Sequence, residues 1–283
     1  MADIIGIHGI AQQHNGRHQL LNKWLLALLD GVELAVGRDR YEPSLDLVFY
    51  GDLFRKSVND TKGSVTLDDL SEDDLRFFAE VQKEIVDPSA PQPPVMTVGK
   101  GFDKPLPAPV ARLATWLDNR FGVAGRMLFL GDLAQVRSYL HDDALATVVF
   151  DRAKEVFGPR PRVLIGHSLG SVIAYEALCI VPDHGVETLI TLGSPLALRS
   201  VRDGLRPRSR SRAPELPPGV SRWFNLYDPR DPVACAGGVR PYWTEALDRR
   251  VHNGNKPHGI YHYLGLRETG EAVEVGLRAR KVP

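Results

Sequence analysis

The sequence predicts an α/β fold in which a mainly parallel sheet is flanked by helices. Short apolar segments typical of buried strands alternate with amphipathic helical segments, beginning with a strand at 3–7, a helix at 19–36 and a strand at 45–50. Further along, the apolar run 163–165 is followed at once by a glycine-containing turn and a helical segment. We therefore expect a single domain that spans residues 1–283.

Composition and charge exclude several other classes of protein. The 283 residues are 43% apolar and 25% charged, as in soluble globular proteins, and the formal net charge is zero, so nothing favours non-specific binding of nucleic acid. Two cysteines do not make a disulfide framework. The N-terminus lacks the basic and apolar regions of a signal peptide, and the apolar stretch near 24–29 is too short to span a bilayer. We expect a cytoplasmic protein.

The remaining segments continue the pattern after an interruption. Strands are expected at 186–192, 221–227 and 249–253, a long helix at 136–157 and a C-terminal helix from 258 to 266. Residues 52–135 break the alternation, with helix-capping signals near 66–74, seven prolines between Pro88 and Pro109 and an apolar stripe at 110–121. We interpret 52–135 as an inserted cap, in which the stripe either packs over the sheet or forms an interfacial lid.

The turn after the run 163–165 carries the main chemical signal. Residues 166–170 read G-x-S-x-G between a strand and a helix, which is the context of a nucleophile elbow. Side chains at Gly166 and Gly170 would collide with the neighbouring strand and helix, so the glycines fit that geometry. We interpret Ser168 as the nucleophile, and the alternative is an ordinary strand-to-helix turn.

A serine hydroxyl needs a base to become a nucleophile, and the base needs an acid that orients it. In the arrangement built on such an elbow, the acid follows the elbow in the sequence, and the histidine base follows the acid. Asp231 is favoured as the acid because its loop has room to turn the carboxylate, whereas Asp228 ends its strand directly and reads as a turn residue. His258 is favoured as the base because it lies between a loop and a helix. His262, one helical turn later, and His167, beside the serine, are interpreted as packing residues.

The tetrahedral intermediate of acyl transfer also needs hydrogen-bond donors for its oxyanion. One is the backbone N–H after the nucleophile, that of Leu169. The other is expected from the open loop after the first strand, where we choose the N–H of Ile10.

Several of these motifs resemble α/β-hydrolases of the intracellular lipase and esterase type. The resemblance rests on IGIHGIAQ, GHSLGSVIAYEAL, TLGSPLAL, WFNLYDPRDPVA and PHGIYHYL. Residues 225–234 are similar to the acid loop of the DDHD-type phospholipases, and GPI inositol-deacylase relatives have similar elbows. The resemblance implies that the aspartate of D-P-V, Asp231, is the triad acid and that the histidine of H-x-x-Y, His258, is the triad base.

These features predict a serine hydrolase that cleaves a lipid-like or small acyl ester through an acyl-serine intermediate. A peptidase, a thioesterase or an acyltransferase would use the same triad, and a non-catalytic binding module could share the fold. We expect neither a metal nor another cofactor, since H-E-x-x-H, C-x-x-C and P-loop patterns are absent. The six arginines within 199–212 could contact a membrane surface, although a solvated mobile loop is the favoured interpretation.

Overall fold

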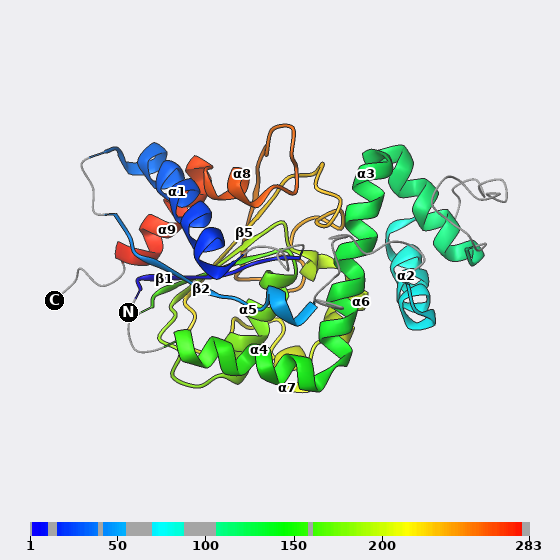
Figure 1. Ribbon diagram of the computed structural model, residues 1–283, viewed down its shortest axis with the longest axis horizontal. Coiled ribbons are helices and arrows are strands. Elements are labelled where there is room, and N and C mark those ends of the chain that lie inside the picture. The colour runs from blue at the N-terminus through cyan, green and yellow to red at the C-terminus, as the bar shows by residue number, and fades with distance from the viewer. Residues whose placement is uncertain are drawn as a thin grey trace.

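The computed structural model describes residues 2–10, 16–38, 42–54, 70–87, 106–157 and 161–278. In these parts of the chain six strands form one sheet in the order β2-β1-β3-β4-β5-β6, and every neighbouring pair is parallel (Figure 1). The strands are β1 (Ile4–Ile7), β2 (Leu45–Val48), β3 (Val163–His167), β4 (Thr188–Leu192), β5 (Arg222–Tyr227) and β6 (Leu247–Arg250). The predicted α/β fold with a parallel sheet is confirmed.

The strand order reverses at β1, and this reversal locates the site. From β1 the chain moves to β2 on one side and then to β3 on the other, with Ile7 of β1 opposite Gly166 of β3. Open parallel sheets bind ligands beyond the carboxyl ends of the strands at such a switch point. The loop after β1 and the turn after β3 therefore meet at one edge of the sheet.

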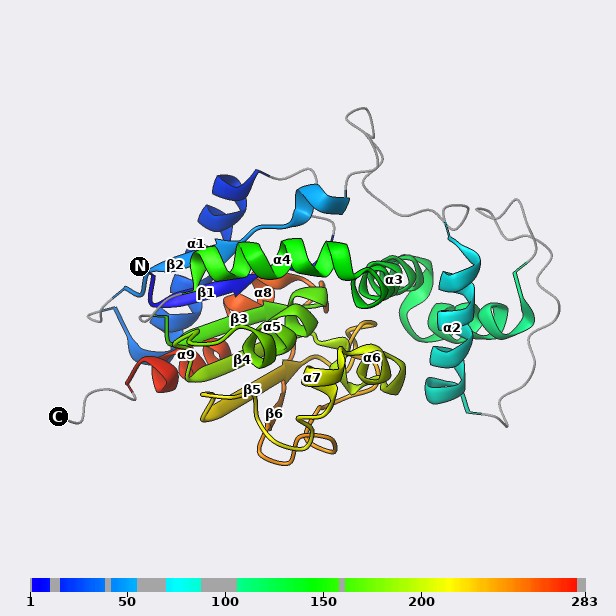
Figure 2. The same ribbon diagram turned by 90° about the horizontal axis from the view of Figure 1, so that it is seen from below.

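Helices cover both faces of the sheet. On one face lie α1 (Arg17–Val36), α8 (Ile260–Leu264) and α9 (Arg267–Arg278), and on the other lie α4 (Asp143–Val156) and α5 (Leu169–Ile180) (Figures 1 and 2). The side chains of β3 alternate accordingly: Val163 and Ile165 pack with the first group, and Leu164 packs with the second. This alternation, with all three residues fully buried, is why the strand reads as a continuous apolar run.

The helical part of the expected cap consists of α2 (Glu72–Ile85) and α3 (Ala108–His141), beside the short helix η1 (Gly51–Phe54). Ser71 begins α2 with a capping box shared with Asp74. Figure 2 shows α2 and the start of α3 lying beyond the end of the sheet. Residues 55–69 and 88–105, with most of the prolines, lie outside the described residues. The cap as a functional unit stays a prediction.

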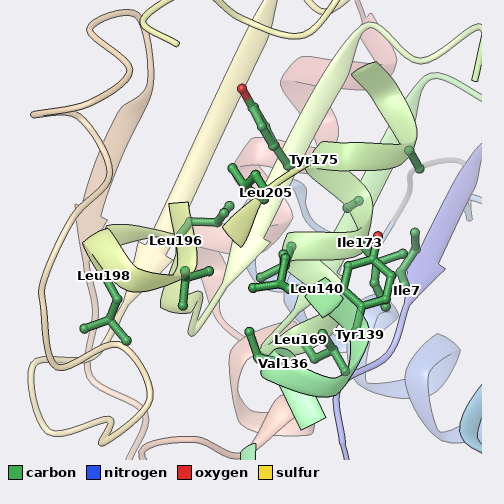
Figure 3. Packing of buried hydrophobic residues seen from close by; sticks show 14 of the residues in the cluster. Ile7, Val136, Tyr139, Leu140, Leu169, Ile173, Tyr175, Leu196, Leu198 and Leu205 are labelled. Atoms are coloured by element: carbon green, nitrogen blue, oxygen red, sulfur yellow. The ribbon is translucent and has the colours of Figure 1, made fainter. Parts of the chain in front are cut away.

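The second half of α3 lies in the main core. Figure 3 shows Val136, Tyr139 and Leu140 of α3 beside Leu169 and Ile173 of α5. The helix expected at 136–157 is divided in the structure, because α3 ends at His141 and Asp142 then starts α4. The Asp142 carboxylate accepts the N–H of Leu145 at 2.9 Å, as helix N-caps do.

The expectation of a mobile arginine-rich loop is wrong. Residues 199–210 form the short helices α6 (Arg199–Gly204) and α7 (Pro207–Arg210), which follow η3 (Pro195–Ala197). Arg206 donates to Glu176 at 2.8 Å, and the Glu176 side chain is fully buried. Arg202 donates to the carbonyl of Leu196 at 3.1 Å. A buried carboxylate requires a paired cation, and this requirement fixes the segment. Contact with a membrane stays a prediction.

None of the helices in the described ranges combines the length and the apolar character needed to cross a membrane.

Close packing of α5 on β1 yields a prediction about stability. A Cβ at Gly170 would lie 2.1 Å from the carbonyl oxygen of Ile7, whereas a Cβ at Gly131 in α3 would meet open space. Gly170→Ala should lower the free energy of unfolding by about 1–3 kcal/mol, and Gly131→Ala should leave it unchanged or raise it by about 0.5–1 kcal/mol. Denaturant titration of both variants measures the difference, and equal effects would contradict the close contact.

Candidate active site

Ser168 occupies a sharp turn between β3 and α5. Its backbone has φ 55° and ψ −127°, a conformation that costs a non-glycine residue about 1–3 kcal/mol. Hydrogen bonds hold the turn on both sides: the Ser168 N–H donates to Leu192 at 3.1 Å, and the Ser171 N–H donates to the Ser168 carbonyl at 2.9 Å. The surrounding backbone thus holds a strained residue at the end of the central strand.

The glycines on either side of Ser168 are required by close contacts. A Cβ at Gly166 would lie 2.6 Å from the carbonyl oxygen of Gly170, and one at Gly170 would lie 2.1 Å from that of Ile7. Both distances are far below van der Waals contact, so the turn accepts only hydrogen at these positions. These are the collisions that the G-x-S-x-G pattern predicts.

Asp231 and His258 are hydrogen-bonded to each other. The Nδ1 atom of His258 lies 2.8 Å and 2.9 Å from the two carboxylate oxygens of Asp231. Asp231 also accepts the N–H of Val233 and the hydroxyl of Tyr263, each at 2.9 Å. Gly193 makes room for the pair: it has φ 55°, and a Cβ there would lie 2.6 Å from the Asp231 carboxylate. The acid is therefore fixed by several donors.

The electrostatics of this pair favour a base that takes up a proton readily. Burial by itself lowers the pKa of His258, but the charge and hydrogen bond of Asp231, together with the charge of Asp132, outweigh burial and raise that pKa above its usual value. The hydrogen bond to Asp231 places the Nδ1 proton, which leaves Nε2 as the acceptor.

His167, interpreted from the sequence as a packing residue, also orients His258. Its Nε2 atom donates to the His258 carbonyl at 3.1 Å, and the two rings lie 4.6 Å apart. Burial holds the pKa of His167 well below its usual value, so the ring stays neutral. His167 therefore contributes a hydrogen bond and no positive charge.

Asp228 stabilises the loop that carries Asp231 and does not contact His258 through any hydrogen bond in the described residues. Its carboxylate accepts the N–H groups of Arg230 at 2.8 Å and Asn253 at 2.7 Å, which ties the loop after β5 to the segment before α8. The Nδ1 atom of His262 lies 3.2 Å from the Asn253 carbonyl. Both residues thus have structural contacts, as the alternative interpretations anticipated.

The Ser168 hydroxyl is hydrogen-bonded to a residue that was not predicted from the sequence as part of the site. Its Oγ donates to Asp132 of α3, and the buried Nε2 atom of His258 has no hydrogen-bond partner in the described ranges. The structure thus brings Asp231 and His258 together, and it pairs Ser168 with Asp132. A signal was present: Asp132 lies in LFLGDLAQV, where an acid interrupts an otherwise apolar helical face.

Asp132 is a buried carboxylic acid with an altered titration. Its side chain is fully buried, and burial is the main reason why its pKa rises to about 6. The charge of Asp231 also raises this pKa, whereas the charge of His258 and the hydrogen bond from Ser168 lower it. One of its carboxylate oxygens accepts from Ser168, and the other, Oδ2, has no hydrogen-bond partner in the residues that the structure describes.

The candidate oxyanion donors are on the two chain segments that meet at the switch point. Leu169 is the first residue of α5, directly after Ser168, and Ile10 follows β1. A Cβ at Gly9 would lie 2.8 Å from the Cβ of Ser168, so the β1 loop touches the turn. This contact supports the choice of Ile10 but leaves both oxyanion roles as predictions.

His8 fixes the start of that loop as a neutral residue. Its Nδ1 atom lies 2.7 Å from the Gly9 carbonyl, and its Nε2 atom accepts the N–H of Tyr50 at 3.1 Å. The His8 ring stacks on the Tyr50 ring at 4.1 Å, and burial lowers the pKa of His8 to about 4. At neutral pH this histidine therefore adds no charge to the site.

Comparison with known proteins agrees with this geometry. A family model described as the alpha/beta hydrolase family matches residues 101–270, more than half of the chain, including Asp132, Ser168, Asp231 and His258. No curated protein and no solved structure matches significantly. Within the described ranges, no three His, Cys, Asp or Glu side chains gather in a way that could hold a metal ion.

The influence of Asp231 on His258 predicts that the pKa of His258 changes when Asp231 loses its charge. Asp231→Asn removes the largest influence that raises the pKa of His258 and leaves the smaller one of Asp132, so the pKa of His258 should fall relative to the wild type. NMR titration of the histidine ring protons measures this pKa, and a His258→Gln variant assigns the signal. A His258 pKa that is unchanged in Asp231→Asn would contradict the proposed electrostatics.

Proposed function

The chain belongs to the alpha/beta hydrolase family, and on this basis we propose that it is a serine hydrolase that cleaves a carboxylic ester through an acyl-serine intermediate. The observation that carries the proposal is the Asp231–His258 hydrogen bond beside the strained turn of Ser168. A serine on such a turn, a histidine with a free acceptor nitrogen and an orienting carboxylate are the three parts of a catalytic triad.

In the acylation step, Ser168 Oγ attacks the ester carbonyl carbon and its proton passes to Nε2 of His258. Because Oγ faces Asp132 in the resting state, the hydroxyl first turns from Asp132 to His258 by rotation about the Cα–Cβ bond. The C–O bond to the alcohol then breaks, and His258 returns the proton to the departing oxygen. Asp231 stays ionised and stabilises the imidazolium.

In the deacylation step, a water molecule gives its proton to His258 and attacks the acyl carbon. Ser168 leaves with that proton, and the carboxylic acid product is released. In both steps the N–H groups of Leu169 and Ile10 are proposed to hold the oxyanion, and each such donor is typically worth about 3 kcal/mol.

The same triad would serve thioesters, amides or acyl transfer to an acceptor other than water. Esters are the first choice because an alkoxide leaves more readily than an amine, and lipid-like or small acyl groups remain within the proposal. A panel of esters, thioesters and peptides separates these reactions. Cytoplasmic location and contact with a membrane remain predictions from the sequence.

The nucleophile is tested by its removal. Ser168→Ala should lower ester turnover by roughly 10⁶-fold, and Asp231→Asn should lower it by less, roughly 10⁴-fold, because the base remains. A fluorophosphonate probe should label the wild-type chain at Ser168 and leave Ser168→Ala unlabelled. Ser171→Ala is the matched control: because it keeps Ser168, it should be labelled like the wild type. Esterase activity retained in Ser168→Ala would remove the mechanism.

The raised pKa of His258 sets the pH dependence. Only neutral His258 accepts the serine proton, so kcat/KM should fall as the pH drops through the pKa of His258, with a midpoint above 6.5. The hydrolysis of a neutral ester between pH 5 and 9 measures this limb. A limb that is absent, or that lies well below 6.5, would argue against His258 as the base.

A further inference from the structure

The contact between Asp132 and Ser168 is unexpected for the proposed reaction. Negative charge develops on the substrate during attack by Ser168, and an ionised carboxylate beside the reacting atoms opposes that charge. With a pKa of about 6, Asp132 is mainly ionised at pH 7 and above. A group that hinders the general reaction therefore needs a compensating partner, and the partner that enters during turnover is the substrate.

The position of Asp132 is fixed by packing. Its neighbours Phe129, Leu130 and Leu133 on α3 are buried in the same apolar cluster as Leu169. The Asp132 carboxylate is therefore held beside Ser168 by the core of the protein and forms a wall of the reaction centre.

The carboxylate has capacity for a hydrogen-bond donor. Oδ2 of Asp132 is buried and has no hydrogen-bond partner among the described residues, and the charges that act on the carboxylate are those of His258 and Asp231. A buried carboxylate oxygen without a hydrogen-bond donor is costly, and an ammonium or N–H donor placed against Oδ2 would remove that cost. Such a donor on the substrate would also compete with the Ser168 hydroxyl for Asp132, which would free Oγ to turn to His258.

The chemistry of the reacting carbon shows which part of the substrate lies near Asp132. In the proposed mechanism the carbonyl oxygen of the acyl carbon accepts hydrogen bonds from the N–H groups of Leu169 and Ile10. The leaving oxygen accepts the proton from Nε2 of His258. The remaining group is the α-carbon of the acyl chain. Since Asp132 contacts the Oγ atom that bonds to the acyl carbon, substituents on that α-carbon are within its reach.

We propose, resting on the serine hydrolase function above, that Asp132 is a specificity-determining residue that selects acyl groups with an ammonium or another N–H donor on the carbon next to the scissile carbonyl. The substrate class is that of α-amino acyl esters. The ammonium binds the Asp132 carboxylate, and the hydroxyl of Ser168 is released toward His258.

A matched pair of substrates tests the proposal. Alanine ethyl ester and ethyl isobutyrate differ only in the replacement of an α-ammonium by a methyl group, and at pH 7 the ammonium is mostly protonated. The wild-type chain should prefer the alanine ester in kcat/KM by about 10- to 100-fold, the range of a hydrogen bond to a charged group. Because an α-ammonium also activates the ester carbonyl toward any nucleophile, the decisive quantity is the change in preference. Asp132→Asn should lower the ratio of kcat/KM for the alanine ester to kcat/KM for ethyl isobutyrate by about 10- to 100-fold.

A surface variant and a stability measurement serve as controls. Asp151→Asn makes the same chemical change on an exposed part of α4 and should leave both rates unchanged. Asp132→Asn should fold and melt at least about 2 °C above the wild type, because it removes a buried charge for which one carboxylate oxygen finds no donor among the described residues. A lower melting temperature would mean that Asp132 stabilises the fold, which contradicts the proposal.

The outcomes distinguish this inference from the function on which it rests. A ratio of kcat/KM for the two esters that is the same in the wild type and in Asp132→Asn would overturn the inference and leave the serine hydrolase function standing. A proportional loss of both rates in Asp132→Asn would also overturn it, since Asp132 would then serve the reaction in general. Fluorophosphonate labelling without turnover of either ester would overturn the substrate class alone, and absence of both labelling and turnover would overturn the function as well.

Discussion

The close approach of α5 to β1 underlies the geometry of the site. Because Gly170 has no Cβ, the first turn of α5 reaches the carbonyl of Ile7, and the β1 loop comes into contact with Ser168. This approach brings Ser168, the N–H of Leu169 and the loop that carries Ile10 to one point at the switch of the sheet. A side chain at position 170 would separate the two segments.

Around that point the polar side chains follow a consistent electrostatic arrangement. His8 and His167 are kept neutral by burial, so they orient backbone groups without adding charge. Asp231 has several hydrogen-bond donors and raises the pKa of His258. Asp132 differs from them, because its buried Oδ2 has no hydrogen-bond partner within the part of the chain that the structure describes. Proteins usually keep such a costly buried group for a function, and we propose that the function of Asp132 is to bind the substrate's α-amino group.

The helix that carries Asp132 also links the insertion to the core. The first part of α3 lies with α2 beyond the sheet, and its second part packs on α5 (Figures 2 and 3). The backbone departs from helical geometry at Gly122, where φ is 72°. One helix therefore joins the outer segment to the wall of the site, and the two parts pack in different surroundings.

Local patterns in the sequence determined the parallel sheet, the elbow and the pairing of the acid loop with His258, because strand periodicity, glycine spacing and chain order are all local signals. The tertiary structure alone decided that Asp132 contacts Ser168, since the two residues are 36 positions apart and meet only through helix packing. It also decided that Arg206 is held by the buried Glu176, where composition alone suggested a solvated loop. Burial and contacts between distant segments fix these charges, and neither is visible in residue order.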